Sequence, residues 1–219
     1  MVILSCGSDD DGSPTGEPDS GIDFEGNATA EYTLTFDTSF SEADFPEEYP
    51  SNPSFGPVLA IVHSPSINVF QSGNVASDGL AAYVETGDVD ALASELTGQE
   101  GDSEGLFFIQ TASNASAVGT SSFDIAFTPT RTRVTFLAKL NPSPDWFLGA
   151  ASLDIVDGNT LKDEIQANLV LLDGGTKVGE TYESSSVSEN NTIGVCEDVP
   201  YADGGVFVES LGNLTISRN

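Results

Sequence analysis

The chain is 219 residues long, which suits one domain with a tail, and it carries 35 acidic against 6 basic residues for a net charge of −29. Its first base is Arg131. Because so acidic a surface repels phosphate backbones and has no basic stripe, we expect no nucleic-acid partner. The acids either keep the protein soluble in saline surroundings or in part collect cations.

The first residues, Ile3-Leu4-Ser5-Cys6, resemble a bacterial lipobox, in which an apolar residue and two smaller ones precede a cysteine that becomes lipid-modified. A signal peptide needs a basic segment and roughly 7–15 apolar residues, so either the true start lies upstream of Met1 or the match is accidental. The acidic stretch after Cys6 is similar to the export tag of bacterial surface lipoproteins. We therefore predict lipidation at Cys6, membrane attachment through that lipid only, and an outer-membrane or cell-surface location on the extracellular side.

The composition also separates a tail from a folded part. Residues 7–28 are rich in Gly, Ser, Pro, Asp and Glu, with Phe24 as their one aromatic residue. We therefore predict a lipobox-like start and disordered tether over residues 1–28 and a single domain over residues 29–219. Cys196 is the only other cysteine. Pairing it with Cys6 would leave nothing to acylate, so we interpret Cys196 as a small hydrophobe at a strand end.

Strand patterns dominate the predicted domain. Residues 29–36 alternate polar and apolar side chains, and residues 58–62 form an apolar run typical of a strand buried on both faces. Residues 77–96 alone have helical spacing, with a break at Gly87-Asp88 that predicts two short helices. Further strand-like runs, separated by turn residues, lie at 106–110, 122–128, 132–140, 147–156, 167–172, 206–209 and 214–217. The prediction is an all-β fold, an antiparallel β-sandwich of about eight or nine strands with one or two short helices.

The most informative stretch is residues 141–149, Asn-Pro-Ser-Pro-Asp-Trp-Phe-Leu-Gly. It resembles the Pro-Ser-Pro-Asp-Trp-Phe-Val-Gly signature of spondin N-terminal domains, which occur in F-spondin, its matrix relatives and many bacterial secreted proteins. Three other groups of residues resemble family motifs in the family's order: 61–64 with 68–73, 76–80, and 172–179. The resemblance extends from about Tyr32 to Ser217 and so covers nearly the whole predicted domain.

The resemblance implies a β-sandwich with short helices at one end and a calcium ion (Ca²⁺) in loops at the sandwich edge. In the family's pattern Asp145 and Asp173 help to bind the metal, with a backbone carbonyl within residues 169–172, which we assign to Leu171. Calcium takes six to eight oxygen ligands without rigid geometry, so two loop carboxylates with carbonyls and waters can form a site. Without a cation, two converging carboxylates would repel each other. The alternative is that both aspartates only form turns by bonding their own backbone.

One residue departs from the family's pattern. Lys177 stands where the family usually has a second acid, and its ammonium would oppose the metal, so we expect weak affinity, in the ~0.1–1 mM class of extracellular modules. Asp154 and Asp157 follow on the next strand and turn. They are either substitute ligands, of which Asp154 is our candidate, or solvated acids.

The other chemistry-bearing side chains have structural interpretations. We predict that Trp146, the only tryptophan, anchors the core, and that His63, the only histidine, is a hydrogen-bonded strand residue. No P-loop, His-Glu-x-x-His or Gly-x-Ser-x-Gly motif is present, so we expect no enzyme, although a glycosidase would need only two carboxylates.

These observations predict a calcium-binding module that acts in adhesion at the cell surface. We expect it to be monomeric and to bind a glycan, a matrix component or a surface protein. A structural component of an envelope or matrix, without a functional metal site, is the second hypothesis, and a carbohydrate-active enzyme is the third.

Overall fold

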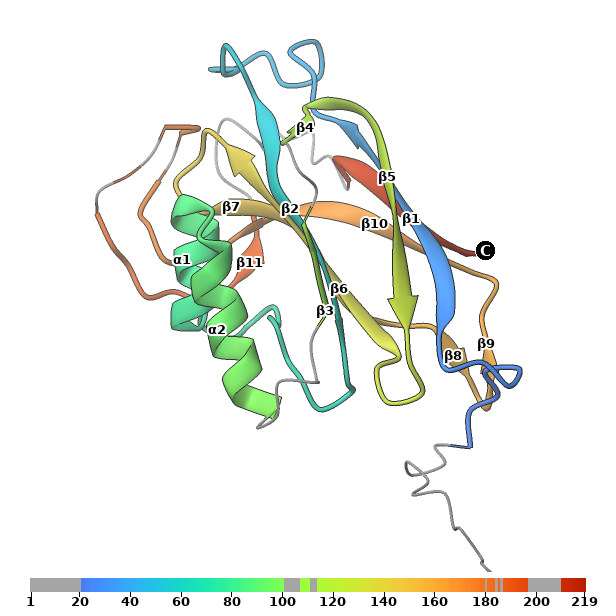
Figure 1. The fold of residues 1–219 in the computed structure, drawn as a ribbon. Coiled ribbons are helices and arrows are strands. Elements are labelled where there is room, and N and C mark those ends of the chain that lie inside the picture. Colours follow the sequence, from blue (N-terminus) through green and yellow to red (C-terminus); the bar gives the residue numbers. More distant parts are fainter. Residues whose placement is uncertain are drawn as a thin grey trace, which may run out of the picture.

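The computed structural model describes residues 21–100, 107–110, 114–179, 181–183, 185, 187–196 and 210–219. Antiparallel strands form most of the regular secondary structure of this part, and two helices lie against one side (Figure 1). The strands are β1 Ala30–Ser39, β2 Ser54–His63, β3 Phe107–Gln110, β4 Ala115–Ser116, β5 Val118–Phe127, β6 Arg133–Asn141, β7 Trp146–Asp154, β8 Val156–Asp157, β9 Thr160–Leu161, β10 Glu164–Asp173, β11 Gly194–Val195 and β12 Gly212–Arg218. The helices are α1 Asp78–Thr86 and α2 Val89–Glu100. The predicted all-β class is confirmed.

One strand joins the two layers of the sandwich. The strand order is β3-β2-β6-β7-β10-β12-β1-β5. The first six residues of β10, Glu164 to Leu169, pair with β12, whereas its last four, Val170 to Asp173, pair with β7. The end of β10 therefore belongs to the layer of β2, β6 and β7, and this pairing places Asp173 beside the start of β7.

The main core lies between the two layers. Tyr32, Leu34 and Phe36 of β1 are at most 1% exposed, which confirms the predicted alternation along that strand. Trp146 of β7 is completely buried in the same core, and its ring packs edge-on against Tyr182 at 5.4 Å. The prediction that Trp146 anchors the core is confirmed.

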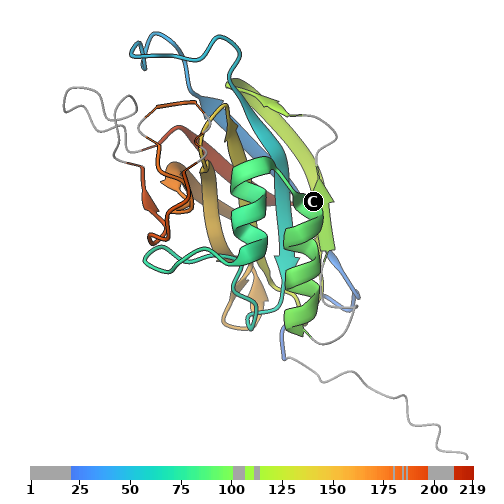
Figure 2. The ribbon, with the colours of Figure 1, turned by 90° about the vertical axis from the view of Figure 1, so that its left-hand side faces the viewer.

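A second core lies between the helices and the outer face of the layer that contains β2, β6 and β7 (Figure 2). Leu59 and Ile61 of β2 face the helices there, while Val58, Ala60 and Val62 face the main core. This is why the strand is a continuous apolar run. The first helix ends at the predicted break: the N–H of Gly87, at a left-handed φ of 76°, donates to the carbonyl of Tyr83 at 2.7 Å and closes α1. The second helix ends at Glu100 rather than at the predicted residue 96.

Some predicted boundaries differ from the structure. Phe24, assigned to the tether, is only 5% exposed in the main core, and Glu25 forms an ion pair with Arg218 at 2.9 Å, so the folded part begins before residue 29. Strand β5 begins at Val118 rather than 122, because the residues that follow the exposed Val118, from Gly119 to Ser122, are small or polar and carry no apolar alternation. Cys6 and the predicted strand at 206–209 lie outside the described residues.

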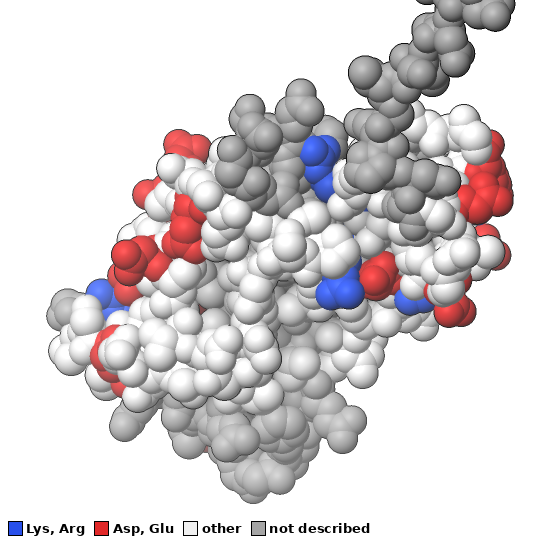
Figure 3. Space-filling view, turned by 90° about the horizontal axis from the view of Figure 1, so that it is seen from below, with Lys and Arg blue, Asp and Glu red and all other residues white. Residues whose placement is uncertain are grey.

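The charged residues are spread over the surface. On the face in Figure 3, acidic side chains form separate groups toward the left and right margins, with uncharged residues and a few basic side chains between them. Neither helix of the described part has the length and apolarity that crossing a membrane requires.

Candidate metal centre

Strand pairing brings Asp145 and Asp173 to the same edge of the sheet. Asp145 immediately precedes β7, and Asp173 ends β10 opposite Trp146. The Gly174 N–H donates to the backbone carbonyl of Asp145 at 3.2 Å. The two aspartates, 28 positions apart in the sequence, are therefore neighbours across a turn, as the family resemblance implied.

The turn before Asp145 is held by a serine. The Ser143 hydroxyl donates to the carbonyl of Leu140 at 2.7 Å, and its oxygen accepts from the Trp146 N–H at 3.1 Å. Ser143 is 2% exposed. Its hydrogen bonds satisfy backbone groups that would otherwise be buried without partners, and they fix the position of Asp145.

The Asp145 carboxylate is completely buried, and its two oxygens differ. Oδ2 accepts from the Thr176 N–H at 2.7 Å, the Thr176 hydroxyl at 3.0 Å and the Lys177 N–H at 3.0 Å. Oδ1, in contrast, has no hydrogen-bond partner among the described residues. A buried acceptor in this state is costly, which makes Oδ1 the oxygen with capacity for a further ligand.

Asp173 forms the turn that approaches Asp145. Its Oδ1 accepts from the Gly175 N–H at 2.6 Å, and Gly175 has a left-handed φ of 68° that favours glycine. A Cβ on Gly174 would lie 3.0 Å from the carbonyl oxygen of Asp145 and 2.9 Å from Cγ2 of Val84 on α1. The two glycines therefore permit the close approach, and Asp173 has the turn-forming role that was the alternative interpretation.

Two ammonium groups surround this turn. Lys177 Nζ lies 3.2 Å from Oε2 of Glu85 on α1 and donates to the Ser188 hydroxyl at 2.9 Å. Lys139 is 5% exposed, and its Nζ lies 3.4 Å from the carbonyl oxygen of Ser143. Burial lowers the pKa of Lys139 to about 8, against the opposing influence of Asp145 and Glu85. Positive charge is therefore already built in near the Asp145 carboxylate.

Lys139 and Glu85 were missed in the sequence analysis. The available signal for Lys139 was a lysine at an interior position of the apolar run from Val134 to Leu140, where a charged residue is unusual. Glu85 gave no signal, because its role depends on how α1 packs against the turn after β10.

The other two predicted ligands differ in position: Leu171 lies in β10 two residues before Asp173, whereas the structure does not bring Asp154 into this cluster. The carbonyl of Leu171 accepts from the Cys196 N–H at 2.9 Å within the sheet. Asp154 lies at the opposite end of β7, roughly 26 Å along the strand, where it bonds the Val156 N–H at 3.0 Å and approaches Arg133 at 3.4 Å. Asp157 lies beyond it in β8. Across the described ranges, no three His, Cys, Asp or Glu side chains gather as a metal-binding group.

The remaining predictions concern single residues. His63 is completely buried at the end of β2, with Nδ1 2.8 Å from the carbonyl oxygen of Ser64 and Nε2 2.9 Å from the hydroxyl of Thr135. Because a carbonyl only accepts, Nδ1 carries the proton in the neutral ring and Nε2 accepts from Thr135. Its interpretation as a hydrogen-bonded strand residue is confirmed. Cys196 is completely buried in the main core directly after β11, as predicted for a small hydrophobe.

Known proteins resemble this chain in sequence. Spondin-2 of Rattus norvegicus is 30% identical over 181 residues, which cover 79% of this chain and 54% of that protein. Spondin-2 of Homo sapiens is 30% identical over 164 residues, covering 72% of this chain and 49% of that protein. Spondin-1 of Rattus norvegicus is 29% identical over 166 residues, covering 71% of this chain and 20% of that protein.

The chain thus spans about half the length of Spondin-2 and a fifth of Spondin-1. The sequence pattern of the Spondin_N family matches residues 30–197, which include α1, α2 and every strand from β1 to β11. The match contains both aspartates of the candidate centre and the glycines that bring them together. The chain therefore belongs to the spondin N-terminal domain family.

Proposed function

We propose that this chain is a non-catalytic binding module that acts outside the cell, and that it holds a calcium ion at the edge where Asp145 and Asp173 meet. The ion would stiffen the loops that meet a glycan, a matrix component or a surface protein. The observation that carries the proposal is Oδ1 of Asp145, a buried carboxylate oxygen without a hydrogen-bond partner in the described part of the chain.

The residues present fit a weak site. Asp145 and Asp173 would supply carboxylate oxygens, and backbone carbonyls and waters would complete the six to eight ligands that calcium takes. Lys139 and Lys177 oppose the ion. The 3.2 Å ion pair of Lys177 with Glu85 neutralises part of that opposition. We therefore expect a dissociation constant in the ~0.1–1 mM class of extracellular modules.

Binding rather than catalysis is supported by the condition of His63. Its ring is completely buried, and both nitrogens are engaged by Ser64 and Thr135. A general base must reach the proton that it removes, and this imidazole has no exposed atom with which to do so.

A calcium titration followed by thermal unfolding tests the metal site. Calcium that binds only the folded chain should raise the melting temperature as its concentration passes the dissociation constant. Asp145→Asn should abolish that rise, whereas Asp154→Asn, at the other end of β7, should leave it intact. Lys177→Asp should strengthen calcium binding by about tenfold or more, because it replaces an opposing charge with a ligand.

Superimposable melts in excess calcium and excess chelator, for both the natural chain and Lys177→Asp, would remove the metal from the proposal and favour a structural component of an envelope or matrix.

The binding function has its own test, an array of glycans and matrix proteins probed with the domain with and without calcium. The lipid anchor at Cys6 remains a prediction, which labelled fatty acid supplied to cells that express the natural chain or Cys6→Ser would test.

A further inference from the structure

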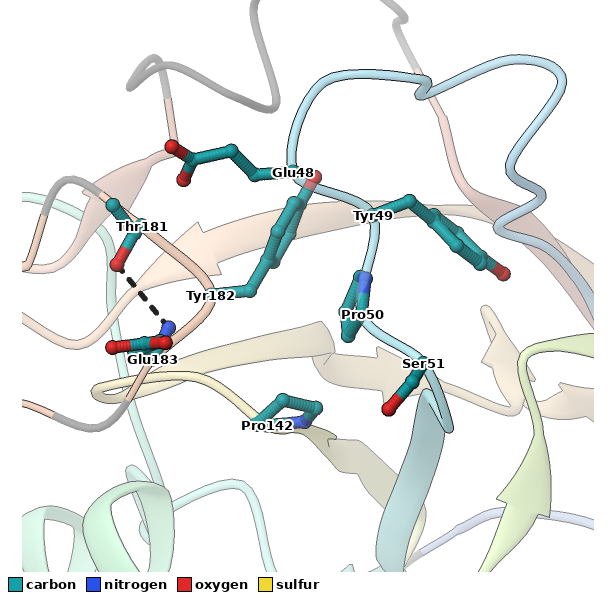
Figure 4. Close-up of a pocket in the computed structure, with 8 residues that line it drawn as sticks. All are labelled: Glu48, Tyr49, Pro50, Ser51, Pro142, Thr181, Tyr182 and Glu183. Atoms are coloured by element: carbon teal, nitrogen blue, oxygen red, sulfur yellow. Dashed lines mark hydrogen bonds between the residues drawn. The ribbon is translucent and has the colours of Figure 1, made fainter.

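Two pockets of about 540 Å³ each differ in the chemistry of their lining. The pocket in Figure 4, between the segment before β2 and the loop after β10, is lined by Glu48 and Glu183, and most of its exposed lining is polar. The second pocket lies between residues 65–72, which follow β2, and the outer face of β7, β10 and β11. Most of its exposed lining is apolar, and its volume is in the range of small-molecule sites. The second pocket is therefore the one whose walls suit a ligand with an apolar body.

The apolar wall of the second pocket is accessible from solvent. Val195 of β11 is 40% exposed, Ala151 of β7 is exposed, and Val170 of β10 is partly exposed. Behind them the ring of Phe70 lies against Gly149, where a Cβ would be 2.8 Å from Cζ of that ring. The pocket therefore presents apolar atoms at its surface on a floor that is already packed, so binding would need little reorganisation.

The charged side chain that lines this pocket is a base, Arg133, although the chain carries 35 acids and only 6 bases. No acidic residue is found among the described residues of the lining, whose other polar side chains are neutral. The side chain of Arg133 is 34% exposed. Its buried Nε lies 3.4 Å from Oδ2 of Asp154 but makes no hydrogen bond within the described part of the chain. The guanidinium therefore has donors left for an anionic group, which it can bind through two parallel hydrogen bonds.

A β-bulge at the wall of this pocket is held by buried hydrogen bonds. Ala151 and Ser152 of β7 lie where the register between β6 and β7 shifts, opposite Thr135. Ser152 has a left-handed φ of 54°, and its N–H donates to the Thr135 hydroxyl oxygen at 3.0 Å, while that hydroxyl donates to Nε2 of His63. A non-glycine residue in this conformation is strained and persists only where its surroundings hold it, as at ligand sites. The Ser152 hydroxyl has no hydrogen-bond partner among the described residues, so it is a second donor available to a ligand.

We propose that this pocket binds a small organic acid that has an apolar body and a single carboxylate. The body would lie against Val195, Ala151 and Val170, and the carboxylate would reach the guanidinium of Arg133. A cationic ligand would meet no acid in this lining, and a purely apolar ligand would leave the guanidinium unused. An anion-selective pocket is the opposite of what a chain of charge −29 offers elsewhere. The site goes beyond the proposed function, because it needs neither calcium nor the loops at the Asp145 end of β7.

The test uses anilinonaphthalene sulfonate, a fluorescent probe with an apolar body and one anionic head, and phenylnaphthylamine, which has the same rings without the sulfonate. Both are titrated at about 150 mM salt, where long-range electrostatics is largely screened, and in chelator. Octanoate and octylammonium then compete with the sulfonate probe. General attraction to an acidic chain favours octylammonium, whereas the pocket favours octanoate, so octanoate should displace the probe about fivefold more effectively.

Matched arginine variants test the anionic contact. Arg133→Met should weaken binding of the sulfonate probe about fivefold, the effect of losing a partly exposed ion pair, and should leave binding of the neutral probe within about twofold. Arg218→Met removes an arginine that pairs with Glu25 outside the pocket, and it should change binding of either probe less than about twofold. Asp154→Asn frees Arg133 from its carboxylate and should strengthen binding of the sulfonate probe about twofold. Equal losses in the two arginine variants would overturn the proposal.

Matched valine variants test the location. Val195→Asp places a carboxylate in the wall and should weaken binding of the sulfonate probe about tenfold or more. Val118→Asp adds the same charge at an exposed valine of β5 outside the pocket and should weaken it less than about twofold. Thermal unfolding of each variant verifies that it is folded.

Equal effects of the two aspartates, stronger displacement by octylammonium than by octanoate, or no binding of the sulfonate probe to the natural chain would each overturn the proposal. Because every titration is run in chelator, these results are independent of the calcium site. If calcium leaves the melting temperature unchanged while the matched variants still separate, only the metal part of the proposed function falls.

Discussion

Strand β7 has an aspartate at each end, and the two lie in opposite environments. At its start, Asp145 is completely buried, and one of its oxygens accepts three hydrogen bonds from Thr176 and Lys177. At its end, Asp154 has a side chain that is 33% exposed and an ion pair with Arg133 at 3.4 Å. A partly exposed ion pair contributes little to stability, whereas a buried carboxylate depends on every donor around it. The ion pair of Asp154 with Arg133 therefore contributes less to stability than the buried carboxylate of Asp145 does.

The largest difference should appear when each carboxylate is removed. Asp145→Ala leaves the N–H groups of Thr176 and Lys177 buried without an acceptor, so we expect the free energy of unfolding to fall by about 3–5 kcal/mol. Asp154→Ala, the matched control, should lower it by about 1 kcal/mol or less. Urea denaturation in chelator measures both. Equal losses would show that burial does not distinguish the two ends.

The next largest effect is a change of stability with pH, which Lys139 should cause at the Asp145 end of β7 and which has no counterpart at the Asp154 end. Lys139 has its usual pKa of 10.5 when unfolded, and burial lowers this pKa to about 8 in the folded chain, against the opposing influence of Asp145 and Glu85. Between these values the unfolded chain binds more protons, so stability should rise as pH increases from about 8 to about 10, by about 2–3 kcal/mol. Below pH 8 both states are protonated, and the full cost of the buried charge is present.

Matched variants isolate this titration. Lys139→Met should remove the rise in the free energy of unfolding between pH 8 and pH 10. Lys162→Met, near Asp154 at the other end of β7, should retain it, because this variant leaves the buried Lys139 in place. Above about pH 10 the trend should reverse, since burial raises the pKa of Tyr83, which then ionises first in the unfolded chain. Parallel pH profiles for the two variants would contradict the role assigned to Lys139.

The close approach of β10 to β7 gives the next largest effect. Gly174→Ala places a Cβ 2.9 Å from Val84 Cγ2 and 3.0 Å from the carbonyl oxygen of Asp145, and we expect a loss of about 1–3 kcal/mol. At Gly194 in β11 the nearest atom to a new Cβ is 4.0 Å away, so Gly194→Ala should change stability by only about 0.5 kcal/mol. Equal effects in thermal melts would mean that the turn tolerates a wider separation.

The sequence was informative wherever a signal was local. The alternation of β1 and the helix break at Gly87 depend on neighbouring residues, and the pairing of Asp145 with Asp173 followed from motifs in the family's order. The burial of Phe24 and the surroundings of Lys139 depend on segments far away in the chain, so composition misassigned the first and offered only a faint signal for the second. Asp154 was grouped with the wrong end of β7 because proximity in sequence does not give proximity along an extended strand.

The smallest predicted effect tests Asp154, at the partly exposed end of β7, alone. Asp154→Asn keeps an oxygen that can accept from the Val156 N–H, now at 3.0 Å from Oδ1, and removes only the charge facing Arg133. The free energy of unfolding should fall by about 0.5 kcal/mol at low salt and by less at about 1 M salt, where the natural ion pair is screened. Paired urea denaturation curves at the two salt concentrations measure this. A loss that is larger and independent of salt would mean that the carboxylate acts through its hydrogen bond to Val156, and the two ends of β7 would then differ in degree rather than in kind.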